Sequence, residues 1–189
     1  MVEPVSFWPL FDLVVRTPRL EMRLPREDEF DDLNVLIDAG IHDPTTMPFA
    51  SPFTDVPPLR RARESAQFWW RQRADWIPDK WAYSAAVYVE GRVVGVQGMM
   101  ADHFGALRSV ETGSGWTGRS RAKGWARRCE TGRPPPGLQG ARSQVAHCGT
   151  FHDNAASRAT SRSVGYVDNG ETLPLRRGTA DRILKARMD

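Results

Sequence analysis

Residues 110–126 read VETGSGWTGRSRAKGWA, and the fold that we expect is organised around this stretch. It begins as a strand, passes through glycine and serine, and ends in a hexapeptide of the form Arg-x-x-Gly-x-Ala. A loop of this kind leaves successive backbone N–H groups free, and a helix that starts after it adds the positive end of its dipole. The stretch therefore predicts a strand that leads into a phosphate-binding loop, with Arg121, Lys123, Gly124 and Ala126 as its binding residues.

The composition is that of an ordinary globular protein. Of the 189 residues, 40% are hydrophobic and 26% are charged, so we expect one domain over residues 1–189. No apolar run approaches the roughly 18 residues that a membrane span needs, and the first residues lack the basic start of a signal peptide. Two cysteines, Cys129 and Cys148, make no disulfide framework. We therefore expect a cytoplasmic protein with reduced thiols and no membrane partner.

The charge is unevenly distributed along the chain. Residues 116–142 contain seven Lys or Arg residues and one acid, Glu130, whereas the whole chain carries a formal charge of only +3. The rest of the chain is therefore mildly acidic. A basic belt on such a body is suited to a polyanionic ligand, and coenzyme A and RNA both qualify.

Hydrophobic periodicity and turn residues predict a mixed α/β chain. Helices are expected from Pro25 to Gly40 and over residues 59–76 and 154–164, with an irregular loop over residues 41–58. Strands are expected over residues 19–24, 81–89, 92–100, 108–112, 144–151, 166–167 and 181–188. Glu90 and Gly91 have the spacing of a two-residue hairpin turn. The three tryptophans of the second helix, Trp69, Trp70 and Trp76, suit either the core or a substrate groove.

A second motif is FHDNAAS at residues 151–157, followed by SVGY at residues 163–166. Asn154 has the side chain of a helix N-cap, and Gly165 has the freedom that a helix end needs. Tyr166 would then be the first core residue of the next strand.

The order of these elements and both motifs resemble the GNAT acetyltransferase superfamily, in particular the branch that acetylates the N-termini of ribosomal proteins. Similar segments are RLEMRLP (residues 19–25), MPFASPFTD (47–55), RVVGVQG (92–98), VETGS (110–114) and FHDNAAS (151–157). The resemblance implies a central, mostly antiparallel twisted sheet flanked by helices. It also implies a cytoplasmic enzyme that transfers acetyl from acetyl-CoA to an amine without a covalent enzyme intermediate.

The resemblance also implies roles for individual residues. Backbone N–H groups of the strand at Gly113, Ser114 and Trp116 would hold the thioester carbonyl. Ser157 would protonate the leaving thiolate, with Tyr166 as the second candidate, and Asn154 would flank the pantetheine arm. Glu111 is the carboxylate of that strand, and we expect it to take the proton of the amine.

The acceptor amine is open at this point: a peptide N-terminus, including that of a ribosomal protein, or a small-molecule amine. A monomer and a homodimer are both compatible with the sequence. A metal site at His147, Cys148, His152 and Asp153 is not expected, because His147 and Cys148 point to opposite sides of a strand and no second ligand pair has the spacing of a structural zinc site.

Residues 115–143 depart from the family pattern. A GNAT protein needs an amphipathic helix after the phosphate loop, whereas RRCETGRPPPGLQGAR at residues 127–142 contains three consecutive prolines and a single leucine. We expect this segment to weaken acetyl-CoA binding. Residues 120–130 can be encoded so that a shifted frame reads Gln-Gly-Lys-Gly-Leu-Gly-Thr-Glu-Met-Arg, a full phosphate loop. A reading-frame error is therefore one explanation, which sequencing of the source DNA would test.

Two other functions compete with the enzyme. The basic belt with Trp116 and Trp125 would suit an RNA- or ribosome-binding module, because bases stack on aromatic rings. A non-catalytic GNAT-like remnant would keep the fold and fail to bind acetyl-CoA.

Overall fold

A computed structural model describes residues 7–116 and 143–189. Its main sheet has eight strands in the order β1-β2-β3-β4-β5-β6-β10-β7. Neighbouring strands are antiparallel except for β5 and β6, which are parallel. The strands are β1 (Val15–Arg16), β2 (Glu21–Arg23), β3 (Trp81–Val89), β4 (Arg92–Ala101), β5 (Ser109–Trp116), β6 (Val145–Phe151), β7 (Val167–Thr172) and β10 (Ile183–Met188), and a separate hairpin is formed by β8 (Leu175–Arg176) and β9 (Thr179–Ala180).

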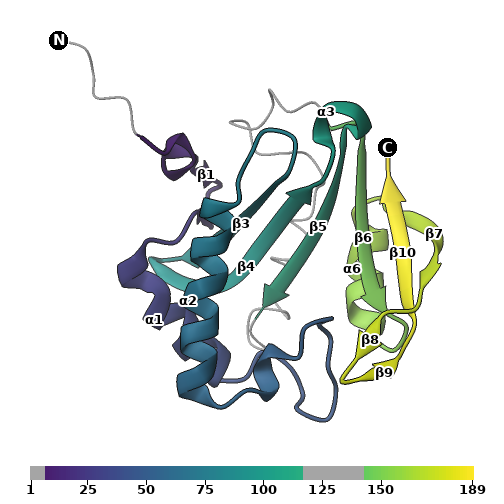
Figure 1. Cartoon of the computed structure of the whole chain (residues 1–189), viewed down its shortest axis with the longest axis horizontal. Coiled ribbons are helices and arrows are strands. Elements are labelled where there is room, and N and C mark those ends of the chain that lie inside the picture. The colour runs from purple at the N-terminus through teal and green to yellow at the C-terminus, as the bar shows by residue number, and fades with distance from the viewer. Residues whose placement is uncertain (1–6, 117–142) are drawn as a thin grey trace.

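Helices lie on both faces of the sheet. The longer ones are α1 (Phe30–Asp38), α2 (Pro58–Ala74) and α6 (Ala155–Ser163), and short turns of helix are η1 (Pro9–Asp12), η2 (Glu27–Glu29), η3 (Phe53–Asp55) and α3 (Phe104–Leu107). Figure 1 shows α1 and α2 in front of β3 and β4, and α6 behind β6 and β10. The mixed, mostly antiparallel sheet flanked by helices that the sequence predicts is confirmed.

The β3–β4 hairpin forms the centre of the sheet. Glu90 and Gly91 make its turn with φ angles of 51° and 73°, and Val89 pairs with Arg92, so the two-residue turn is confirmed. Both faces of β3 are covered, because Ala86 and Val87 point to opposite sides and both are 0% exposed. This strand therefore reads as a nearly continuous apolar run.

Each face of the sheet has its own hydrophobic core. On the α1–α2 side, Phe30 and Leu33 pack with Trp69 and with Ala86 of β3. On the opposite side, the core includes Val87, Val110, Ala146 and Tyr166 together with side chains of the N-terminal segment. The face on which a residue of β4 or β5 lies can thus be read from its cross-strand partner.

The first helix begins later than the sequence predicts. Pro25 does not open it; instead η2 precedes α1. The reason lies in Glu29, whose carboxylate accepts hydrogen bonds from the backbone N–H of Arg26 at 2.8 Å and from the guanidinium of Arg23 at 2.7 Å. These hydrogen bonds stabilise η2, the turn that precedes α1. The other end is as expected, since Gly40 follows the helix with a φ of 91°.

The Arg23–Glu29 pair predicts a pH dependence of stability. The hydrogen bond from Arg23 lowers the pKa of Glu29 from 4.5 to about 2. The folded state therefore favours the ionised carboxylate, and this stabilisation is complete above pH 4.5 and is lost as the pH falls toward about 2. We expect Glu29→Gln to lower the free energy of unfolding by roughly 3 kcal/mol at neutral pH. In urea unfolding the deficit should shrink toward about pH 3, and a deficit independent of pH would contradict this account.

Within the described residues, no helix is both long and apolar enough to cross a membrane.

Candidate active site

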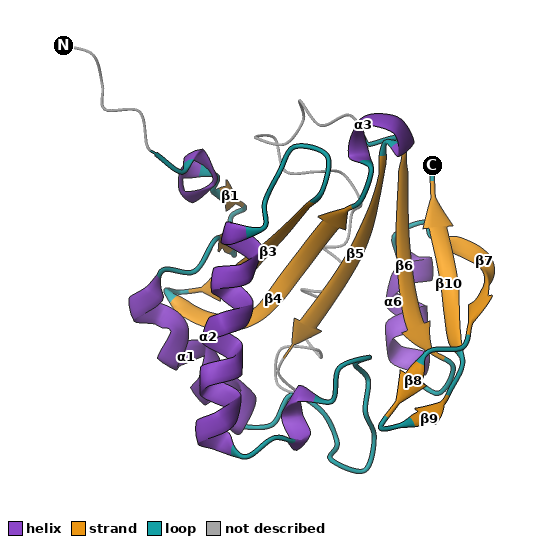
Figure 2. Ribbon diagram, in the orientation of Figure 1, coloured by secondary structure: helices purple, strands orange, loops and turns teal. Residues whose placement is uncertain are grey.

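The most distinctive feature of the sheet is the separation of β5 from β6. The two strands pair at only three positions, Ser109 with Val145, Val110 with Ala146 and Glu111 with His147. Beyond Glu111, β5 still pairs with β4 as far as Trp116, and β6 still pairs with β10. Figure 2 shows the two strands adjacent at one end and diverging toward the other. Over residues 112–116, β5 therefore has no ladder with β6.

Two buried hydroxyl groups lie where the strands separate. The Thr112 hydroxyl is 3.3 Å from the carbonyl oxygen of His147 and 2.8 Å from the hydroxyl of Tyr166. Thr112 is 8% exposed and Tyr166 is 3% exposed. A threonine hydroxyl has one proton, so if it donates to His147, Tyr166 donates to Thr112. If Thr112 instead donates to Tyr166, the proton of Tyr166 is available to a ligand beside β5.

The N-cap predicted at Asn154 is confirmed. Its side-chain oxygen accepts a hydrogen bond from the backbone N–H of Ser157 at 3.1 Å. At the other end of α6, Gly165 has a φ of 111° and the N–H of Tyr166 donates to Ser161 at 3.1 Å. Ser157 thus lies in the first turn of α6, whereas Tyr166 follows the end of the helix.

This cap predicts a modest effect on stability. We expect Asn154→Ala to lower the free energy of unfolding by about 1 kcal/mol, because it leaves an N–H of the first turn without its partner. Asn154→Asp is the matched control, since a carboxylate caps equally well. A thermal melt measures the effect on Tm, and an activity assay is run on the same protein. An unchanged Tm together with lost activity in Asn154→Ala would show that Asn154 acts only in ligand binding.

Glu111 lies on the opposite face of β5 from Thr112. Its carboxylate is 3.2 Å from the ammonium of Lys185 on β10, and its side chain is 48% exposed. Lys185 reaches it over Gly149 of β6, where an added Cβ would lie 3.3 Å from the Lys185 nitrogen. The carboxylate is therefore half-exposed and paired with one ammonium group.

On the face of the sheet that carries Glu111, three nearby positions of β4 and β5 are glycines. Gly98, Gly113 and Gly115 share this face, because Gly98 pairs with Gly113 and the neighbouring pairs alternate. We call these three residues the glycine floor. A Cβ added at Gly113 would meet no atom of the described residues within 4 Å, whereas one at Gly115 would lie 3.9 Å from the ring of Phe49. The floor therefore leaves space for a substrate next to the carboxylate.

One functional residue was missed in the sequence. Gln97 of β4 is 9% exposed and donates from its amide nitrogen to the carbonyl oxygen of Gly113 at 3.2 Å. Its side-chain oxygen has no hydrogen-bond partner among the described residues. Gln97 thus contacts β5, from the neighbouring strand, at the stretch that has diverged from β6. The signal was a single amide in an otherwise apolar strand.

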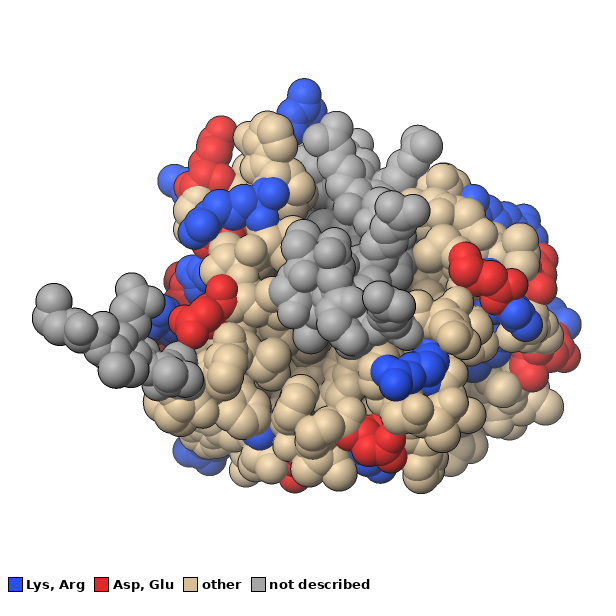
Figure 3. Space-filling model, turned by 90° about the horizontal axis from the view of Figure 1, so that it is seen from above, with Lys and Arg blue, Asp and Glu red and all other residues tan. Residues whose placement is uncertain are grey.

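The remaining predicted residues are placed only in part. Ser114 pairs with Gln97 and Trp116 with Gly95 in the β4–β5 ladder. The phosphate-loop residues Arg121, Lys123, Gly124 and Ala126, the basic belt and Trp125 lie outside the described residues. On the described part of the face seen in Figure 3, basic and acidic side chains are interspersed, without a broad field of one sign.

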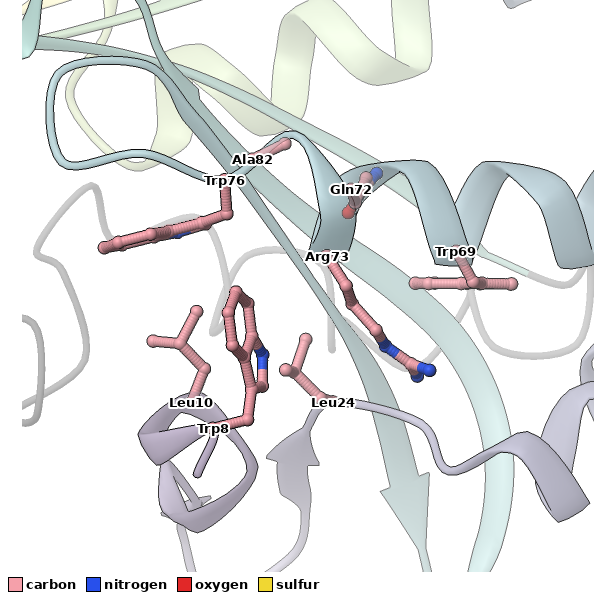
Figure 4. A pocket seen from close by; sticks show the side chains of 8 residues that line it. All are labelled: Trp8, Leu10, Leu24, Trp69, Gln72, Arg73, Trp76 and Ala82. Atoms are coloured by element: carbon pink, nitrogen blue, oxygen red, sulfur yellow. The ribbon is translucent and has the colours of Figure 1, made fainter. Parts of the chain in front are cut away.

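The three tryptophans expected on the second helix do not line this site, and Trp76 lies just after the end of α2. Trp69 is in the core at 5% exposure, Trp70 donates to Glu27 at 3.0 Å, and Trp76 meets Trp8 edge to face at 6.1 Å. Figure 4 shows Trp8, Trp76 and Arg73 around a cavity of about 10 Å³, which is room for about one water molecule. A larger hollow lies along β2 and the β3–β4 turn, away from the separation of β5 and β6. Among the described residues, no cluster of three potential metal ligands occurs.

Solved structures have the same fold. No family model matches the sequence. The chain superposes on the ribosomal L7/L12 alpha-N-protein acetyltransferase RimL in complex with coenzyme A, with a TM-score of 0.75, 12% identity and coverage of 93% of this chain and 97% of that one. The ribosomal-protein-S5-alanine acetyltransferase of Vibrio fischeri superposes with a TM-score of 0.70 and 13% identity, over 94% of this chain and 96% of that one. The microcin C7 self-immunity acetyltransferase MccE, in complex with acetyl-CoA and AMP, superposes with a TM-score of 0.70 and 14% identity, over 91% of this chain and 93% of that one. The GNAT fold expected from the sequence is thereby confirmed.

Proposed function

We propose that this chain is an acetyl-CoA-dependent N-acetyltransferase of the GNAT superfamily, which acetylates a primary amine by direct attack. The observation that carries the proposal is the separation of β5 from β6 after Glu111, with Tyr166 at its origin and Glu111 on the other face. Coenzyme A and acetyl-CoA, bound in two of the similar structures, support the choice of acyl donor.

The described residues fit a thioester substrate. The stretch of β5 that has diverged from β6 is proposed to offer backbone N–H groups to the carbonyl oxygen, and charge on that oxygen grows when the carbonyl carbon becomes tetrahedral. Gln97 holds the carbonyl of Gly113 from behind, which fixes the orientation of that peptide unit. Arg121, Lys123, Gly124, Ala126 and Asn154 are proposed to bind the rest of coenzyme A.

Glu111 is proposed as the base. Its carboxylate exchanges Lys185 for the substrate ammonium and accepts a proton directly or through one water molecule. The amine nitrogen then bonds to the carbonyl carbon over the glycine floor.

Tyr166 is proposed as the acid, and Ser157 stays the alternative. When the carbon–sulfur bond breaks, the thiolate needs one proton. Tyr166 lies at the buried apex of the separation, and Thr112 orients its hydroxyl at 2.8 Å. Ser157 is half-buried at the far end of α6, so it protonates the thiolate only if the sulfur lies toward the open ends of the strands.

The acceptor is proposed to be a peptide N-terminus, as in the two ribosomal-protein acetyltransferases of similar fold. A ribosomal protein is the corresponding partner, and a small-molecule amine is the alternative. The proposal treats the chain as a cytoplasmic enzyme, either monomer or homodimer.

An acceptor screen tests this function. The purified chain is incubated with acetyl-CoA and peptides beginning with serine or alanine, or with small amines, and released thiol is recorded. Thiol release that depends on one acceptor class supports the proposal. Acetyl-CoA binding in calorimetry without transfer to any acceptor would favour a remnant. Failure to bind acetyl-CoA, together with RNA binding that weakens steeply with salt, would favour the RNA-binding alternative.

A further inference from the structure

The β8–β9 hairpin contacts the loop between α1 and α2, although the two belong to opposite halves of the sheet. In Figure 1 the loop passes below the end of β5 and approaches β8 and β9. The contacts link residues more than a hundred positions apart in the sequence. They lie at the end of the sheet where β5 and β6 are farthest apart (Figure 1).

Arg177 makes the first of these contacts. Its Nε and Nη2 atoms donate to the two carboxylate oxygens of Asp55, both at 2.8 Å, and Nη2 also donates to the carbonyl of Pro44 at 3.2 Å. A two-point arginine–carboxylate pair fixes orientation as well as distance. The hydrogen bonds from Arg177 also lower the pKa of Asp55, so the pair is charged at neutral pH.

Arg176 makes the second contact and anchors the hairpin. Its Nε donates to the carbonyl of Met47 at 2.7 Å, while Nη1 donates to Asp153 and Asp181 at 2.9 and 2.8 Å. Its guanidinium lies 4.3 Å from the ring centre of Phe151, and the side chain is 11% exposed. The hairpin is thus attached to the end of β6 and to the loop by one buried cation.

The backbone conformation of Arg177 indicates that its side chain does more than form the turn. Arg177 and Gly178 form the two-residue turn with φ angles of 50° and 82°. Such turns favour glycine, asparagine or aspartate, because other side chains are strained at positive φ. An arginine there costs the turn some stability, and its contacts with Asp55 and Pro44 offset that cost.

The loop that Arg177 holds carries an aromatic wall of the substrate space. Phe49 lies 3.9 Å from the Cβ position of Gly115. It packs at 5.0 Å against Phe53 and at 5.7 Å against His42. Movement of the loop would therefore move Phe49 relative to the glycine floor. Thr112 and Tyr166 lie on the other face of β5 and would be unaffected.

We propose that Arg177 and Asp55 form a latch that positions the α1–α2 loop and so determines affinity for the acceptor amine. The inference rests on the proposed function. Arg177 is a positioning residue, because it acts through Phe49 rather than on the reacting atoms. The acyl donor, held by β5 and the other face, is bound independently of the latch.

The test uses the full chain and Arg177→Asn, which removes the latch but keeps a residue suited to positive φ. Hydrogen exchange is measured over residues 41–57, KM for the acceptor by thiol release, and acetyl-CoA affinity by calorimetry. We expect faster exchange in the loop and a KM roughly 5- to 10-fold higher, with acetyl-CoA affinity unchanged. The double exchange Arg177→Asp with Asp55→Arg should restore both. High salt should raise the acceptor KM of the wild type by a larger factor than that of Arg177→Asn, because salt screens the partly exposed latch only in the wild type, whereas it screens the amine at Glu111 in both.

Three results would overturn different parts of the proposal. Unchanged exchange in Arg177→Asn would overturn the latch. Faster exchange with an unchanged acceptor KM would overturn its control of acceptor binding. A wild-type chain that transfers no acetyl group would overturn the proposed function, and the exchange measurement would still judge the latch by itself.

Discussion

Replacement of Tyr166 by phenylalanine is expected to lower kcat by about 10²- to 10⁴-fold, the usual effect of losing a proton donor. The hydroxyl is removed from the apex of the β5–β6 separation, where it lies 2.8 Å from Thr112. The ring, which fills the core, is retained. Acetyl-CoA affinity should therefore change little, and calorimetry and thiol release on the same preparation measure the two effects separately.

Ser157→Ala is the matched comparison, because it removes the other candidate hydroxyl without changing the cap at Asn154. If Tyr166 is the acid, this variant retains most of its turnover. A large loss of turnover in Ser157→Ala, with near wild-type turnover in Tyr166→Phe at saturating substrate, would transfer the role to Ser157. A thermal melt checks that both variants remain folded.

Replacement of Gly113 by valine is expected to lower activity by roughly 10²-fold, because a displaced substrate loses its reactive alignment. An added Cβ meets no described atom within 4 Å, so the backbone has room for a first side-chain carbon at this position. The methyl groups would instead occupy the space beside Glu111. Acceptor kinetics measure the effect, and Tm should stay near that of the wild type.

A graded series makes this prediction stricter. Gly113→Ala should lose less activity than Gly113→Val, since the obstruction grows with side-chain volume. Equal activity in all three proteins would show that the amine does not approach over the glycine floor. A decrease in Tm that parallels the decrease in activity would show instead that the side chain disturbs the sheet.

The centre of the fold could be predicted because its signals are local. Two short runs rich in apolar residues predict β3 and β4, and the turn at Glu90 and Gly91 joins them. The cap at Asn154 and the glycine after α6 likewise follow from neighbouring residues. Such features depend on side chains within about four positions, which a sequence displays directly.

The β8–β9 hairpin was missed because its strands have only two residues each. Its turn places an arginine where turn-forming residues are expected, so no turn signal marks it. The start of α1 was wrong for a related reason. Proline at residue 25 suits a first helical position, but Glu29 stabilises a tighter turn through Arg23, which belongs to a strand.

The candidate site was predictable as a set of residues but not as an arrangement. Glu111 and Tyr166 were singled out, whereas their partners Lys185 and Thr112 lie 74 and 54 positions away from them in the sequence. The end of the β5–β6 ladder at Glu111 is likewise a property of the assembled sheet. Local patterns carry no information on such distant pairs, and the phosphate loop at residues 121–126 stays a sequence-based prediction.

The most direct measurement is transfer of an isotope-labelled acetyl group from acetyl-CoA to a peptide amine, followed by mass spectrometry of both peptide and protein. Wild type, Tyr166→Phe and Gly113→Val are compared at equal concentration under single-turnover conditions. We predict label on the peptide amine with the wild type, far less with either variant, and no acetylated protein intermediate. Unlabelled peptide with the wild type, or equal labelling by all three proteins, would contradict catalysis at the separation of β5 and β6.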